Sequence, residues 1–164
     1  HNEGSVSYIN QQGNIIAKED IFKSVSFCAP YLELIEEMTG LEFLQFHQGF
    51  KPFLQGIDPA MVLQKVELEK AANKQIRYYS SGMKQRLKLG QRFFTDTPIV
   101  LLDEPCTNLD ASGIAIYQSL LEQLKKDRIV LIASNDPVEF KQSNQQLNIS
   151  YYSSSANSSL YTSN

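Results

Sequence analysis

Two adjacent carboxylates, Asp103 and Glu104, follow an unbroken apolar run at residues 99–102. Such a run is typical of a strand that is buried on both faces of a parallel sheet. Ligands bind where parallel strands end, and a carboxylate there can hold Mg²⁺ through water, opposite phosphate groups. The next carboxylate can orient or deprotonate an attacking water. The pattern predicts a phosphate-handling site, although an Asp-Glu turn after a core strand is the alternative.

A second candidate site lies upstream, where Ser80, Ser81 and Gly82 open a predicted helix. The first N–H groups of a helix and a nearby hydroxyl form an anion site that suits a γ-phosphate. An ordinary helix N-cap is the alternative reading of these three residues. Further polar groups follow the apolar runs: residues 107–110 end in a carboxylate, and Ser134-Asn135-Asp136 follows the run at 129–132.

The elements around these residues predict an α/β protein. The apolar runs at 99–102 and 129–132 predict strands that are buried on both faces, and the helix between them predicts a βαβ unit. The remaining elements are a hairpin around Gly13, a strand at 25–28, and a last strand with alternating Leu147, Ile149 and Tyr151. Residues 31 to 94 are helical by pattern.

Three polar residues predict where the helices of this middle region begin. Thr39 and Glu42 form a capping box, and Asp58-Pro59 is a helix start with an Asp N-cap and proline at the first position. We expect the Asp58 helix to carry Val62, Val66 and Ala71. Ser80 and Ser81 open the third helix.

Composition limits the class of protein. The chain has 164 residues and a formal net charge of −3, which argues against sequence-independent nucleic-acid binding. It contains no apolar run near the ~20 residues of a membrane helix. Two cysteines, Cys28 and Cys106, cannot form a disulfide framework and lack partners at metal-binding spacing. We expect a structural or surface role for His47, and a solvated helix end at residues 125–128.

Taken in order, these motifs resemble those of the nucleotide-binding subunit of ATP-binding-cassette (ABC) transporters, over roughly residues 4–150. Residues 79–86 are similar to the ABC signature, and 99–104 look like Walker B plus the catalytic glutamate. Residues 107–110 resemble the D-loop, and Asn135 falls where the family has its switch histidine.

The resemblance implies a P-loop NTPase fold, with a RecA-like core of mostly parallel sheet and an inserted α-helical subdomain. The implied division is a partial core at 1–30, the helical subdomain with the signature at 31–92, and the core with Walker B, D-loop and switch at 93–150. A Ser/Asn-rich tail occupies 151–164.

The resemblance also implies an ATPase that energises transport, with two subunits sandwiching ATP and Mg²⁺. Asp103 would hold Mg²⁺ through water, Glu104 would act on the attacking water, and Asp110 would couple the two sites. The signature residues would contact the γ-phosphate bound to the second ABC subunit: Ser80, Ser81, Gly82 and Met83. Separate transmembrane permease subunits would be the other partners, at the cytoplasmic, inner face of the membrane, with no nucleic acid bound.

Departures from the family pattern leave alternatives open. None of the eight glycines precedes a lysine, so the Walker A loop is absent, and we expect a chain truncated before or at the end of that segment, which alone binds no ATP. Pro30 stands at the Q-loop glutamine position, and Asn135 cannot carry a proton as the switch histidine does. These changes favour a catalytically weak or regulatory ABC module that drives ATP-dependent assembly. A soluble, non-transport ABC ATPase is the third reading.

Overall fold

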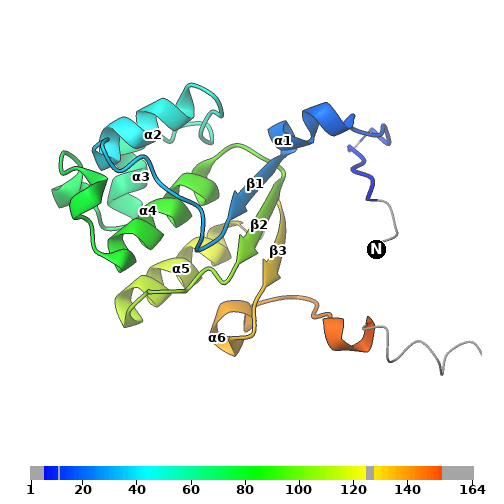
Figure 1. Ribbon diagram of the computed structural model, residues 1–164. Coiled ribbons are helices and arrows are strands. Elements are labelled where there is room, and N and C mark those ends of the chain that lie inside the picture. The colour runs from blue at the N-terminus through cyan, green and yellow to red at the C-terminus, as the bar shows by residue number, and fades with distance from the viewer. Residues whose placement is uncertain (1–5, 11, 125–127, 153–164) are drawn as a thin grey trace, which may run out of the picture.

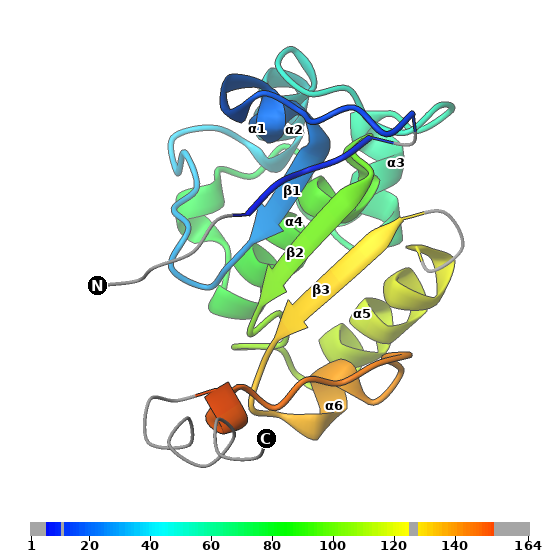
Figure 2. The same ribbon diagram turned by 90° about the vertical axis from the view of Figure 1, so that its right-hand side faces the viewer.

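Three parallel strands form the sheet at the centre of the protein (Figures 1 and 2). The computed structural model describes residues 6–10, 12–124 and 128–152. The strands lie in the order β1 (Val25–Cys28), β2 (Ile99–Asp103) and β3 (Ile129–Ala133). Cys28 is paired with Leu102, and Leu102 with Ile132. With α5 (Ala111–Leu124) between β2 and β3, the predicted βαβ unit is confirmed.

The two faces of the sheet differ in burial. Val100 and Leu102 point to the face that α4 (Ser81–Phe94) and α5 cover, and they are buried. Figure 2 looks onto the other face, where Ile129 and Leu131 of β3 are 59% and 58% exposed. The prediction that residues 129–132 are buried on both faces is therefore wrong for the described part of the chain, because its helices pack on one face.

Helix starts in the middle region follow the predicted caps. Thr39 and Glu42 form the capping box of α2 (Gly40–Gln48), and the Asp58 side chain caps α3 (Pro59–Lys65). The α3 helix is shorter than expected, because Glu67 adopts a left-handed φ of 55° just after Val66, its C-cap. Ala71 therefore lies in a separate 3-10 turn, η2 (Glu69–Ala71).

Helix α4 is the most deeply packed element of this region. Its side chains Leu87, Leu89 and Phe93 are fully buried. Gly90 brings α4 close to α3, because a Cβ at this position would lie 2.8 Å from Val66 Cγ1. The helix thus contacts α3 on one side and the sheet on the other.

Near the ends of the described chain, two predictions change. The hairpin around Gly13 is reduced to one antiparallel bridge, Ile9 with Ile15, closed by a turn in which Gly13 has a φ of +83°. The predicted last strand is wrong, because residues 149–152 form a 3-10 turn, η4 (Ile149–Tyr152), that makes no ladder. Most of the predicted tail, from 153 onward, lies outside the described residues.

Four short elements complete the fold: η1 (Lys18–Asp20), α1 (Ile21–Ser24), η3 (Ile76–Tyr78) and α6 (Pro137–Phe140). Across the residues that the structure describes, no helix is long and apolar enough to cross a bilayer.

Arg128, the last residue of the basic run at 125–128, does not project into solvent as expected for a helix end. Its guanidinium donates to the carbonyls of Phe93, Thr95 and Thr97, and to the Thr97 hydroxyl. Residues 125–127 lie outside the described residues. Arg128 therefore joins the start of β3 to the end of α4, which corrects the expectation.

Candidate functional site

The paired carboxylates lie where β2 ends. Asp103 is the last residue of the strand and is half-buried, whereas Glu104 is exposed. The Glu104 backbone has a φ of 41°, a conformation that costs a non-glycine residue roughly 1–2 kcal/mol. Its N–H donates to the carbonyl of Ala133, the last residue of β3, at 2.9 Å. This bond fixes where the chain leaves the sheet.

A tight loop then leads to α5. The N–H of Thr107 donates to the Glu104 carbonyl at 3.1 Å, and that of Leu109 donates to the Cys106 carbonyl at 2.9 Å. Asp110 caps α5, since its Oδ1 accepts from the Gly113 N–H at 2.8 Å. This bond, followed by one from Ser112, lowers the pKa of Asp110. The carboxylate that we expected to couple two subunits therefore already stabilises a helix start.

Glu104 and Asn135, the two candidate catalytic residues, line one cleft of about 580 Å³. Asn135 follows β3 and is exposed. The sequence predicted that both side chains lie at carboxyl ends of neighbouring strands, and the structure brings them together. The rest of the lining comes from the same two loops and from α5 and α6: Cys106, Thr107, Leu109, Ile114, Ser134, Asp136, Pro137 and Glu139.

The signature-like residues open α4 as expected. Ser80 is the N-cap, and its hydroxyl accepts from the Met83 N–H at 3.2 Å. Ser81 is exposed and Gly82 is half-buried. A Cβ on Gly82 would lie 3.1 Å from the carbonyl oxygen of Asn108, so the absence of a side chain lets the helix start approach the loop after β2.

A buried hydrogen bond joins the helix start to that loop. Gln85 is 3% exposed, and its Nε2 donates to the Pro105 carbonyl at 2.8 Å. Sequence reasoning assigned no role to Gln85. Its position one turn before Leu89, on the apolar side of the predicted helix, was the available signal. The bond places the start of α4 beside the carboxyl end of β2.

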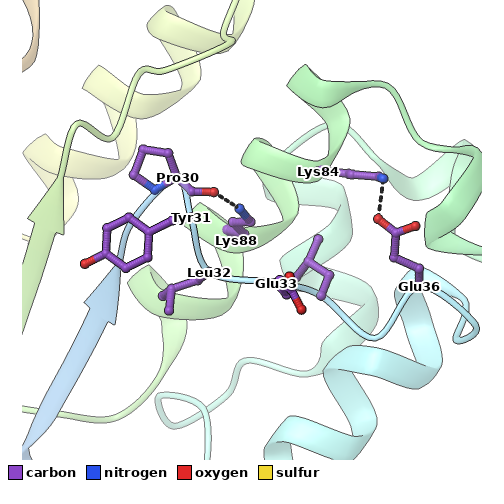
Figure 3. A pocket seen from close by; sticks show the side chains of 8 residues that line it. Pro30, Tyr31, Leu32, Glu33, Glu36, Lys84 and Lys88 are labelled. Atoms are coloured by element: carbon purple, nitrogen blue, oxygen red, sulfur yellow. Dashed lines mark hydrogen bonds and ion pairs between the residues drawn. The ribbon is translucent and has the colours of Figure 1, made fainter.

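Pro30 lies in a different groove. Figure 3 shows that its carbonyl accepts from the Lys88 ammonium of α4, at 2.6 Å. One turn earlier, Lys84 pairs with Glu36 at 2.5 Å. The groove between α4 and residues 30–36 has a volume of about 390 Å³, and burial lowers the pKa of Lys88. Pro30 lines this groove, whereas the cleft of Glu104 and Asn135 does not include it.

The carboxylate of Asp103 at the end of β2 fits Mg²⁺ only as one ligand among several. Nowhere in residues 6–10, 12–124 and 128–152 do three or more metal-binding side chains cluster. Mg²⁺ is usually held by one or two carboxylates together with water and substrate phosphates, rather than by an all-protein cage. Asp103 supplies one carboxylate, which suits a metal that arrives with a nucleotide.

Neither cysteine has the properties of a reactive thiol. Burial raises the pKa of Cys28 to about 11 and that of Cys106 to about 12, where the charges of Glu139 and Asp136 act in the same direction. Both therefore remain neutral thiols at neutral pH, and a neutral thiol is a poor nucleophile and a poor metal ligand.

Comparison with known proteins places this geometry in a family. The family model described as "ABC transporter" matches residues 1–107. ABC transporter A family member 8 of Dictyostelium discoideum is 29% identical over 128 residues, which is 78% of this chain and 14% of that protein. The ABC transporter ATP-binding protein YybJ of Bacillus subtilis is 29% identical over 135 residues, covering 81% and 61%. The chain thus spans less than two thirds of these relatives.

Solved structures agree on the fold. The ATP-binding cassette MJ0796, a dimer in a post-hydrolysis state with ADP and Pi, matches with a TM-score of 0.63 and 23% identity. The match covers 79% of this chain and 62% of that one. The predicted α/β, P-loop NTPase class is therefore confirmed, and the chain belongs to the ABC transporter family.

Proposed function

We propose that this chain belongs to an ATPase that energises a membrane transporter, with ATP held between two ABC subunits. The observation that carries the proposal is the Gln85–Pro105 hydrogen bond. It joins the signature-like start of α4 to the loop after Asp103 and Glu104, so both candidate phosphate-facing groups belong to one edge of the protein.

The paired carboxylates would do different work. Asp103, half-buried at the end of β2, would hold Mg²⁺ through water, and this ion would neutralise charge on the phosphates when bound with ATP. Glu104 is exposed in the cleft and would accept a proton from the attacking water. Asn135, in the same cleft, would donate a hydrogen bond from its amide to the γ-phosphate.

The start of α4 would act on ATP held by the second subunit. Ser81 and Gly82 would offer backbone N–H groups at the positive end of a helix of 14 residues. Ser80 and Met83, which bond to each other in the N-cap, would shape this surface. Asp110 would hold the facing loop in place through its cap on α5.

The partners that we propose are a second ABC subunit and separate transmembrane permease subunits. With these partners, the protein would lie in the cytoplasm, at the inner face of the membrane. The YybJ relative supports the transporter partners, since its name describes an ABC transporter ATP-binding protein.

A regulatory module with weak turnover is the second candidate function. Two observations favour it: Pro30 has no side-chain amide and its carbonyl is held by Lys88, and Asn135 cannot relay a proton at neutral pH. Such a module would use ATP binding to drive assembly of a complex rather than repeated hydrolysis.

The test compares ATP binding and hydrolysis by the 164-residue chain with those of a chimera that adds the Walker A segment of the Bacillus relative before it. Because the 164 residues contain no Gly-Lys pair of a Walker A loop, we expect no appreciable binding by the chain alone. We expect the chimera to hydrolyse ATP, and Glu104→Gln to slow it by about 100-fold or more.

Glu69→Gln is the matched control, since Glu69 is an exposed glutamate of η2 that does not line the cleft. Micromolar ATP binding by the chain alone would refute the Walker A argument. An unchanged rate in the Glu104→Gln chimera would show that Glu104 is not catalytic. A chimera that binds ATP without turnover would favour the regulatory module.

A further inference from the structure

Glu139 joins three segments around the cleft. It lies on α6, the turn of helix that follows Asn135, and only 4% of it is exposed. Its Oε1 accepts from the backbone N–H of Cys106 at 2.6 Å, and its backbone carbonyl accepts from the Tyr117 hydroxyl of α5 at 2.7 Å. One residue therefore connects the segment after β3, the loop after β2, and α5.

The carboxylate is not fully satisfied by these contacts. Its second oxygen, Oε2, is buried and has no hydrogen-bond partner among the residues that the structure describes. Glu139 also contributes to the lining of the cleft, together with Glu104 and Asn135. Burying a charged group is costly, and a buried unpartnered oxygen calls for an explanation beyond packing.

The N–H that donates to Oε1 lies in a strained loop, and holding that loop is a role that can offset the cost of burying this side chain. Cys106 lies two residues after Glu104 and four before Asp110. The loop bends sharply on both sides of it, since Glu104 and Asn108 have φ values of 41° and 65°. A loop with two left-handed residues holds its shape only where surrounding bonds fix it. The Glu139–Cys106 bond is placed to fix it from the side of Asn135.

We propose that Glu139 is a positioning residue, which holds the loop of Glu104 and Asp110 in register with the segment that carries Asn135. It acts through the Cys106 backbone and touches no reacting atom. This inference rests on the proposed function for its catalytic consequence, whereas its structural part stands independently of ATP hydrolysis.

The structural part is tested on the 164-residue chain by amide hydrogen exchange without nucleotide. Glu139→Ala removes the acceptor, and we expect exchange in residues 104–110 to accelerate by at least about tenfold, with β1 and α3 unchanged. Glu139→Gln keeps an acceptor oxygen, so we expect near wild-type protection. Glu69→Ala is the matched control. Unchanged protection of this loop in Glu139→Ala, or an equal loss throughout β2 and α5, would overturn the proposal.

The catalytic part is tested in the Walker A chimera. A misplacement of about 1 Å can cost up to about 100-fold in rate, so we expect Glu139→Ala to lower kcat by at least about tenfold and to leave the KM for ATP within about twofold. Glu139→Gln should restore most of kcat. An equal change in KM and kcat would overturn the positioning role. A chimera without any turnover would refute the proposed function, and the exchange data would still decide the role of Glu139.

Discussion

Acid should destabilise this protein through one buried histidine. His47 is 9% exposed, and its Nε2 lies 2.8 Å from the Thr95 hydroxyl oxygen. Because that hydroxyl donates its own proton to the Gln91 carbonyl, Nε2 must be the donor, and Nδ1 carries no proton in the neutral ring. Protonation would add a buried charge near two cations, Arg92 and Lys51.

The magnitude follows from the pKa. Burial, with smaller contributions from Arg92 and Lys51, lowers the pKa of His47 from 6.5 to about 4. The unfolded chain therefore binds the proton at higher pH, and stability is lost as the pH falls from about 6.5 towards about 4. Between pH 7.5 and pH 5 the linkage amounts to about 2 kcal/mol. Because Arg92 and Lys51 are only half-buried, solvent screens part of their repulsion, and we expect a loss of about 1 to 2 kcal/mol.

The assay is urea unfolding at pH 7.5 and pH 5, with wild type and His47→Gln side by side. Glutamine can still donate to Thr95 but does not titrate, and the only other histidine of the sequence is His1. Most carboxylates remain ionised at pH 5, so their contribution is shared by both proteins. We expect the wild type to lose about 1 to 2 kcal/mol more than the variant. Equal losses would refute the proton assignment and the buried charge argument.

Two substitutions test the packing of α4. Arg128→Ala removes four hydrogen bonds to Phe93, Thr95 and Thr97, at and just after the end of α4. We expect it to lower the free energy of unfolding by about 2–4 kcal/mol in urea titrations, and an effect below about 1 kcal/mol would contradict this role. Gly90→Ala places a Cβ 2.8 Å from Val66, so overpacking of about 1–3 kcal/mol should outweigh the helix propensity gain of about 1 kcal/mol. A raised melting temperature of Gly90→Ala would contradict the overpacking argument, since it would show that α3 shifts to accept the added methyl group.

Local signals in the sequence predicted the starts of the helices and the strands of the sheet. The caps at Thr39, Asp58 and Ser80 depend only on residues within one turn, and the structure confirms all three. The runs at 99–102 and 129–132 are strands, and their apolar, β-branched residues suit a pleated surface that is at least half-buried.

Features that depend on distant neighbours could not be predicted in this way. The exposure of Ile129 and Leu131 reflects which face the described helices cover, and the run itself contains no sign of it. Arg128 belongs to a charged run that is typical of solvent, yet carbonyls from a segment about 30 residues earlier surround its guanidinium. The alternation at 147–151 had no partner strand to pair with among the described residues.

For the candidate site, the sequence predicted only which residues lie at the same edge of the sheet. Glu104 and Asn135 end neighbouring strands, and this topology alone brought them to one cleft. Gln85 was missed although its place on the apolar side of α4 indicated burial, because the sequence does not show the Pro105 carbonyl that it meets. Glu139 was missed because its partner, the Cys106 N–H, lies 33 residues away in the sequence. The chemical roles of Asp103, Glu104 and the start of α4 stay predictions until turnover is measured.

Side-chain hydrogen bonds connect helix α4 to the chain next to all three strands. Lys88 reaches the carbonyl two residues beyond β1, Gln85 reaches the carbonyl two residues beyond β2, and Arg128, just before β3, reaches back to the helix end. A helix of 14 residues is a stiff beam about 21 Å long. Because α4 is bonded near all three strands, sliding or rolling of the helix against one strand would strain its bonds near the other two. A force on either end of α4 would therefore rotate the helix and the sheet together, and any deformation would concentrate in the connecting loops.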